Sequence, residues 1–213
     1  MPRLLKPLLA PLIAAAGLVA LPARADLHHG FDAGAEGWTV VEGGEMTWQA
    51  TGGASGGYLR FTDLDSRDML AVLNLGGVDW SAYMGATLSF QVRNLSGHTD
   101  YWAPFGQVTL THTAGSGITV DVAGVGQPAN DGLWHTYSLV LDPVVFANVL
   151  GSVKTLSIKM EFAVSDPARP ATFETAGLDN VNLSTLSAVP EPASWALLAA
   201  GGLLLAGARR RAR

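Results

Sequence analysis

Apolar and polar residues alternate in short runs through the middle of this 213-residue chain. The segment TLSFQVRN (87–94) places Leu, Phe and Val on one side of an extended chain, and Ser, Gln and Arg on the other. The segment LSIKMEF (156–162) repeats the pattern with Leu, Ile, Met and Phe. A period of two residues is typical of a strand with one buried face. The pattern therefore predicts an all-β protein.

Gly, Asn, Asp and Ser separate these runs into about ten short segments, a number that favours a β-sandwich of two antiparallel sheets. Helical structure is expected in two places, a turn at Trp80–Met84 and a helix at Pro143–Leu150, where proline suits the first helical position. The predicted strands are Trp38–Val41, Glu45–Ala50, Tyr58–Thr62, Met69–Leu75, Ala86–Arg93, Gly106–Thr113, Ile118–Val122, Trp134–Leu141, Thr155–Phe162 and Gly177–Leu183.

Residues 1–25 differ from the middle of the chain. Two basic residues precede the apolar run Leu8–Leu21, and Ala23 and Ala25 give the small-x-small pattern of a cleavage site. We expect a secretory signal peptide that is removed before Asp26. The alternative is an uncleaved N-terminal anchor helix.

The C-terminal segment combines an apolar run with a basic end. Ala193–Ala208 is long enough to reach about 24 Å as a helix, slightly less than a hydrocarbon core of about 30 Å. Pro190 and Pro192 cannot continue a helix and keep the preceding strip extended. The segment predicts a short transmembrane helix with its C-terminus in the cytoplasm. The expected stop-transfer residues are Arg209, Arg210, Arg211 and Arg213.

This segment, residues 187–213, closely resembles the PEP-CTERM sorting signal of Gram-negative bacteria. The resemblance depends on Val189, Pro190, Glu191 and Pro192, followed by the apolar run and the arginines. It implies processing by an exosortase at the inner membrane and delivery to the cell surface or an extracellular biofilm matrix rich in exopolysaccharide. A plain C-terminal anchor is the alternative.

Charge is distributed unevenly along the chain. Seventeen of the 18 acidic residues lie in residues 26–189, together with six of the 13 Lys and Arg residues. Such an acidic middle cannot neutralise phosphates, which argues against a nucleic-acid partner. The chain has no cysteine, so disulfides, thiolate catalysis and cysteine metal sites are excluded.

Several phrases of the middle region resemble one family of extracellular domains in content and order. They are GFDAGAEGW, GGYLRFTD, VDWSAYMGATLSFQVR, DGLWHTYSLVLD, VLGSVKTLSIKMEF and GLDNVNLS. In this order the chain looks like the jelly-roll sandwich of the laminin B (domain IV) module and of many carbohydrate-binding modules. The resemblance implies that residues 26–186 form one jelly-roll domain, with Trp38, Trp80 and Trp134 in its core.

The resemblance also implies a structural Ca²⁺ where the first and last strands meet. Carboxylates and backbone carbonyls are the ligands that Ca²⁺ prefers. The expected ligands are Asp32, Gly57, Asp63 and Asp179. The alternative is that these aspartates hydrogen-bond their own turns.

A carbohydrate site is expected in the loop GHTDYWAPFGQ, because sugars stack on aromatic rings and polar groups fix their orientation. Its candidate residues are Asp100, Tyr101, Trp102 and Gln107. The alternative is that the two aromatic rings plug the end of the sandwich.

The chain lacks the Gly-x-Ser-x-Gly, His-Glu-x-x-His and phosphate-loop motifs of common enzymes. We therefore expect a non-catalytic protein, and the two resemblances imply a surface or matrix protein that binds or embeds in exopolysaccharide. A purely structural, calcium-stabilised matrix module is the first alternative. A glycan-active hydrolase, which would need two carboxylates facing a cleft, is the second.

Overall fold

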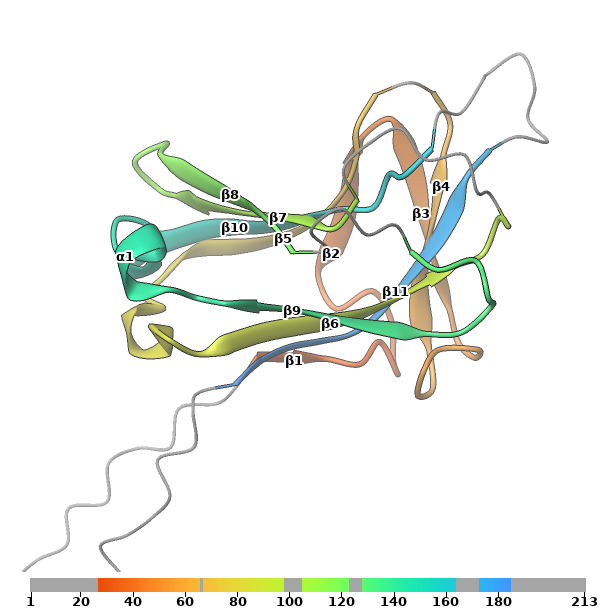
Figure 1. Ribbon diagram of the computed structural model, residues 1–213, viewed down its shortest axis with the longest axis horizontal. Coiled ribbons are helices and arrows are strands. Elements are labelled where there is room, and N and C mark those ends of the chain that lie inside the picture. The colour runs from red at the N-terminus through yellow and green to blue at the C-terminus, as the bar shows by residue number, and fades with distance from the viewer. Residues whose placement is uncertain (1–26, 66, 98–104, 123–127, 164–172, 185–213) are drawn as a thin grey trace, which may run out of the picture.

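Two antiparallel β-sheets face one another in the computed structural model (Figure 1). The structure describes residues 27–65, 67–97, 105–122, 128–163 and 173–184. The fold class predicted from the sequence, an all-β sandwich of two antiparallel sheets, is confirmed. The predicted signal peptide and transmembrane helix lie outside the described residues.

Sheet A has the strand order β3-β4-β11-β6-β9, and β1 also pairs with β11. The strand β11 has β4 along its first half and β1 along its second half, and its register shifts between Asp179 and Asn182. The strands of sheet A are β1 (Leu27–His29), β3 (Gly44–Gln49), β4 (Tyr58–Asp63), β6 (Thr87–Asn94), β9 (His135–Val140) and β11 (Thr175–Ser184).

Sheet B has the order β2-β5-β10-β7-β8. Its strands are β2 (Trp38–Glu42), β5 (Met69–Val78), β7 (Gln107–His112), β8 (Gly117–Asp121) and β10 (Val153–Lys159). Three short helical elements lie between the strands: η1 (Ser81–Tyr83), α1 (Pro143–Phe146) and η2 (Leu150–Ser152). The helix expected at Pro143–Leu150 is therefore one α-helical turn followed by a 3₁₀ turn.

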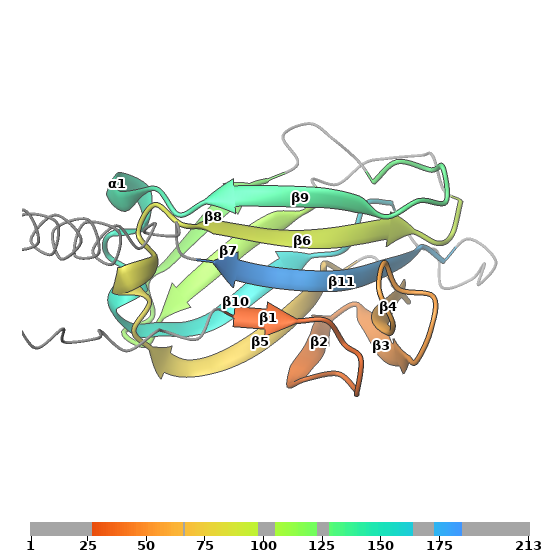
Figure 2. The ribbon, with the colours of Figure 1, turned by 90° about the horizontal axis from the view of Figure 1, so that it is seen from below.

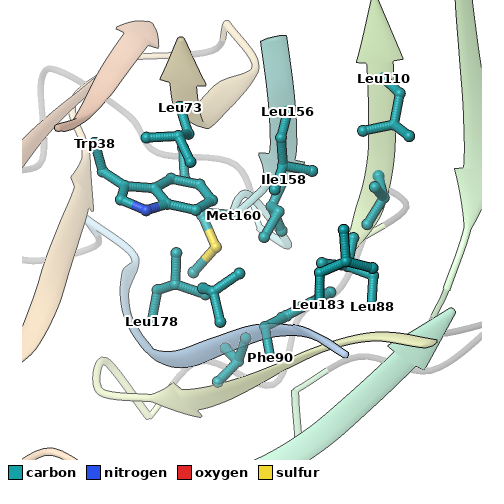
Figure 3. Packing of buried hydrophobic residues seen from close by; sticks show 14 of the residues in the cluster. Trp38, Leu73, Leu88, Phe90, Leu110, Leu156, Ile158, Met160, Leu178 and Leu183 are labelled. Atoms are coloured by element: carbon teal, nitrogen blue, oxygen red, sulfur yellow. The ribbon is translucent and has the colours of Figure 1, made fainter. Parts of the chain in front are cut away.

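The core is the space between the two sheets, where apolar side chains from both inner faces meet (Figure 3). The alternating apolar residues of 87–94 and 156–162 are all fully buried there. Trp38 and Trp80 are also buried, as expected. Every strand buries apolar side chains away from water between the two sheets. This burial holds the sheets together.

Both described chain ends lie at one end of the sandwich (Figure 2). Leu27 at the start of β1 pairs with Leu183 near the end of β11. The short elements η1, α1 and η2 lie at the same end, which we call the tail-side end (Figures 1 and 2). Among the described residues, no helix has the length and apolar character needed to cross a bilayer.

Candidate functional site

The outer face of sheet B carries small hydroxyl side chains on three neighbouring strands. They come from alternate positions of β7, β8 and β10, whose other side chains fill the core or pack against it. We call this surface the hydroxyl face, and it consists of Thr109, Thr111, Thr119, Thr155 and Ser157. These side chains are partly or fully exposed.

Strand register joins these residues into rows across the sheet. One row runs from Thr119 through Thr109 to Ser157, and it continues through Val72 of β5 to Thr39 of β2. The hydroxyls of Thr109 and Thr119 are 2.8 Å apart. In the next row the hydroxyls of Thr111 and Thr155 are 2.5 Å apart. Across β8, β7 and β10 the rows therefore form a surface of hydroxyl donors and acceptors, and Val72 separates it from Thr39.

Polar and charged groups flank the hydroxyl face at the end opposite the tail-side end. The Gln107 amide nitrogen donates a hydrogen bond to Asp121 Oδ1 at 2.7 Å. Lys159 Nζ lies 2.6 Å from Asp68 Oδ1 and 3.7 Å from Glu161 Oε2. The hydrogen bond from Lys159 lowers the pKa of Asp68, so this carboxylate is ionised at neutral pH. The amide of Gln107 and the carboxylate of Asp121 therefore lie beside the hydroxyls, whereas Lys159 is buried and paired with Asp68.

The structure places one of the four predicted carbohydrate residues on this face. Gln107 begins β7 and points outward, because the neighbouring Val108 is buried. Asp100, Tyr101 and Trp102 lie outside the described residues, but Trp102 precedes Gln107 by only five positions. The hydroxyl face is not among the sites predicted from the sequence. The signal was present in QVTLTH and GITVD, where every second residue is polar.

The outer face of sheet A carries an aromatic pair. The rings of Tyr58 and Trp134 meet edge to face at 5.5 Å between centroids. The Trp134 ring lies over Gly177, where an added Cβ would stand 2.6 Å from the ring. Trp134 Nε1 donates to Gly52 O at 3.3 Å. The expectation of a core position for Trp134 is therefore wrong: it precedes β9 and covers the outside of the sheet.

The predicted calcium residues fall into two places. Asp32, Gly57 and Asp179 surround the glycine-rich loop 50–57, where Cβ atoms on Gly53 and Gly56 would collide with the carboxylates of Asp179 and Asp32. Asp63 ends β4, and the pairing of Leu59 with Leu178 places it about five residues, or roughly 16 Å, from Asp179. The structure thus separates Asp63 from the other three residues, because Asp179 directly follows Leu178, which pairs with Leu59 near the start of β4.

Asp179 is fully buried beneath the loop. Its Oδ2 accepts hydrogen bonds from the backbone N–H groups of Ala54 at 2.8 Å and Ser55 at 3.2 Å, and its Oδ1 accepts one from Asn180 at 2.6 Å. Burial raises the pKa of Asp179, and the nearby charge of Asp32 adds to this rise. A carboxylate has about four acceptor sites, so Asp179 retains about one for a cation.

No group of three or more His, Asp or Glu side chains in the described part of the chain is arranged to hold a metal ion. Calcium at loop 50–57 would therefore need backbone carbonyls in addition to Asp32 and Asp179, a mixture that Ca²⁺ accepts.

A cluster of buried carboxyl groups lies at the end opposite the tail-side end, near the ends of β4 and β10 and the start of β11. Burial raises the pKa of Glu161 to about 7 and that of Glu174 to about 8, with contributions from Asp63 in both cases. Glu174 accepts hydrogen bonds from the backbone N–H groups of Phe162 and Ala163. Glu161, Glu174 and Asp63 are all fully buried, so these carboxyl groups do not face a substrate in the way that a hydrolase requires.

The fold has counterparts among solved structures. The CBM22-1 xylan-binding domain from Paenibacillus barcinonensis Xyn10C matches with a TM-score of 0.50 and 17% identity, over 79% of this chain and 100% of that chain. An exo-beta-agarase matches with a TM-score of 0.50 and 13% identity, over 70% of this chain. This chain spans 23% of that agarase. The shared architecture is the jelly-roll sandwich of carbohydrate-binding modules.

The C-terminal segment carries a PEP-CTERM protein-sorting motif, which matches over residues 188–211. The match contains Val189, Pro190, Glu191 and Pro192, and it includes three of the four predicted stop-transfer arginines. Ala23 and Ala25 of the predicted cleavage site lie outside the described residues. No curated protein sequence matches the chain. The laminin B likeness is compatible with the fold and stays a prediction.

Proposed function

We propose that this chain is a non-catalytic exported protein that is anchored in the inner membrane, processed there, and delivered to the cell surface or matrix, where its sandwich binds polysaccharide through the hydroxyl face. The PEP-CTERM sorting motif supports the first part, because it is the kind of segment that an exosortase-type enzyme processes. The short spacing of five residues between Ser184 and Pro190 keeps the domain close to that enzyme.

The observation that carries the binding proposal is the hydroxyl face itself. Its rows of Ser and Thr run across β8, β7 and β10, and Gln107 and Asp121 form a further row at one end of the strands. An extended glycan offers hydroxyl groups at regular intervals, and a flat row of hydroxyl and amide groups can hydrogen-bond to several sugars in succession. The similar xylan-binding domain makes polysaccharide the first ligand class to test.

The test removes one pair of facing hydroxyls from each sheet. Thr109→Val with Thr119→Val keeps shape but removes the pair 2.8 Å apart on sheet B. The matched control, Ser89→Ala with Ser138→Ala, removes a facing pair on the outer side of sheet A. We expect the first variant to bind matrix polysaccharide at least about tenfold more weakly, which corresponds to about 1.4 kcal/mol. Loss of binding in the control alone would assign the ligand to sheet A.

The aromatic residues before β7 give a separate arm of this experiment. We propose that Tyr101 and Trp102, with Asp100, form the stacking part of the same site, since they precede Gln107 directly in the chain. Trp102→Ala is expected to weaken binding in polysaccharide affinity electrophoresis. Unchanged migration of that variant would show that Trp102 is not part of the site. The hydroxyl face would then still be tested by the double variant Thr109→Val with Thr119→Val.

Calcium at loop 50–57 is a second candidate role, favoured by the two carboxylates that face this loop. Asp32 and Asp179 repel each other there, and a cation held by both and by loop carbonyls would relieve that repulsion. We expect EDTA to lower the melting temperature, and Asp32→Asn to remove this sensitivity. A melting temperature that EDTA does not change would exclude a strongly coupled ion.

A further inference from the structure

The tail-side end carries a patch of exposed aliphatic side chains. We call it the apolar patch, and its members are Met84, Val140, Val144 and Val145, which are 41%, 56%, 88% and 46% exposed. Val144 is the most exposed large hydrophobic residue among those that the structure describes. Single exposed apolar residues are ordinary on protein surfaces, but a group of them on one end indicates a contact.

Backbone hydrogen bonds bring the members of the patch together. Gly85 N donates to Leu141 O at 2.8 Å, and Leu141 N donates to Ala86 O at 2.9 Å. These bonds hold the segment that follows η1 beside the end of β9, directly before α1. Asp142 caps α1 by accepting hydrogen bonds from Val144 N and Val145 N, at 2.8 and 3.1 Å. The cap fixes both valines in one turn.

The described chain ends beside this patch. Ser184, the last residue of β11, pairs with Thr87, and Thr87 pairs with Val140. Two strand spacings, about 10 Å, therefore separate Ser184 from the patch. The predicted transmembrane run begins at Ala193, nine residues later, a distance that an extended chain covers in at most about 30 Å. The described chain therefore ends at the same end of the sandwich that carries the patch.

We propose that the apolar patch rests on the lipid bilayer while the C-terminal segment anchors the chain, so that the sandwich stands with its tail-side end on the membrane. This inference depends on the proposed export route. The tether raises the local concentration of lipid around the patch, so weak partitioning is enough to orient the domain. The two aspartates nearest the patch use their carboxylates within the fold: Asp142 caps α1, and Asp79 accepts from Ser81 N at 2.8 Å.

A second copy of the chain is a less suitable occupant. Four aliphatic side chains expose on the order of a few hundred Å², whereas a stable dimer buries about 800 Å² on each partner. A lipid surface has no such minimum area, because each methylene group that enters the interface contributes independently.

The test uses the absence of cysteine, which makes every introduced cysteine a unique labelling site. Val144→Cys in the patch and Leu133→Cys at the opposite end of β9 are matched positions, 88% and 62% exposed. Each variant of the exported chain, residues 26–213, is labelled with an environment-sensitive dye and reconstituted in phosphatidylcholine vesicles that contain nitroxide lipids. We expect at least threefold stronger lipid quenching at position 144 than at position 133.

Equal quenching at both positions would overturn the proposal. Adding Val140→Asp and Val145→Asp to the Val144→Cys chain is expected to reduce its quenching to the level at position 133; quenching that persists would show that the patch is not the contact. Dye self-quenching that rises with the ratio of protein to lipid would assign the patch to a second copy. Failure of the chain to float with the vesicles would instead contradict the membrane-anchored intermediate.

Discussion

A single glycine determines how the outer face of sheet A is built. Gly177 of β11 lies between Arg60 of β4 and Arg93 of β6 in the strand register. Because it has no side chain, the Trp134 ring can lie directly on the sheet and reach Tyr58. Any side chain at position 177 would lift the Trp134 ring from the sheet. The packing of Trp134 therefore depends on a residue that is distant in the sequence.

Gly177→Ala is therefore expected to destabilise the fold by about 1–3 kcal/mol, because its methyl group would overlap a rigid ring. Urea unfolding followed by tryptophan fluorescence measures the loss of stability. Gly151→Ala is the matched control, since a Cβ there has no heavy atom within 4 Å. Equal stability of the two variants would show that the packing of the Trp134 ring does not require glycine at position 177.

At the scale of strands, the alternation of side chains predicts which face of a strand is buried. It does not predict which strands pair or in which register. The sequence indicated that 87–94 and 156–162 each bury one face, and they do. It did not indicate that Asp63 and Asp179 lie at opposite ends of the β4–β11 pairing, because that follows from register. Trp134 was misplaced for the same reason: its environment depends on Gly177, 43 positions away in the sequence. The hydroxyl face likewise needs the order β10-β7-β8.

The buried carboxyl groups of Glu161 and Glu174, near the ends of β4 and β10 and the start of β11, make the stability of the fold depend on pH. The folded-state pKa values of Glu161 (about 7) and Glu174 (about 8) lie above the ordinary value of 4.5. The folded protein therefore binds more protons than the unfolded chain in this range, and the free energy of unfolding decreases as pH rises from about 4.5 to about 8. Lys159 opposes the effect at Glu161, whereas Asp68 and Asp63 reinforce it.

Glu161→Gln isolates this contribution, because glutamine has the same shape and no charge. We expect the variant to match the natural protein near pH 5 and to exceed its stability at pH 8 by about 1–3 kcal/mol. Urea unfolding at a series of pH values measures the difference. A constant difference across the series would mean that Glu161 does not titrate in the folded protein.

On the scale of the whole molecule, the tail-side end, where the chain ends lie, and the hydroxyl face, where we propose glycan binding, are different parts of the sandwich. Both described ends of the chain lie at the tail-side end, where the apolar patch also lies (Figure 2). The hydroxyl face runs along the side of sheet B, and its polar border with Gln107 and Asp121 lies toward the opposite end. In the arrangement that we propose, the chain is held at the membrane and processed there while the hydroxyl face stays accessible to glycan.

Glycan binding by the hydroxyl face can be tested residue by residue with a nuclear magnetic resonance map of the sandwich, titrated with fragments of the matrix polysaccharide. We expect shift changes concentrated at the hydroxyl face, with Gln107 next to it; its residues are Thr109, Thr111, Thr119, Thr155 and Ser157. Saturable changes confined to Tyr58, Trp134 and their neighbours on sheet A, or no change at all at millimolar fragment, would contradict this proposal.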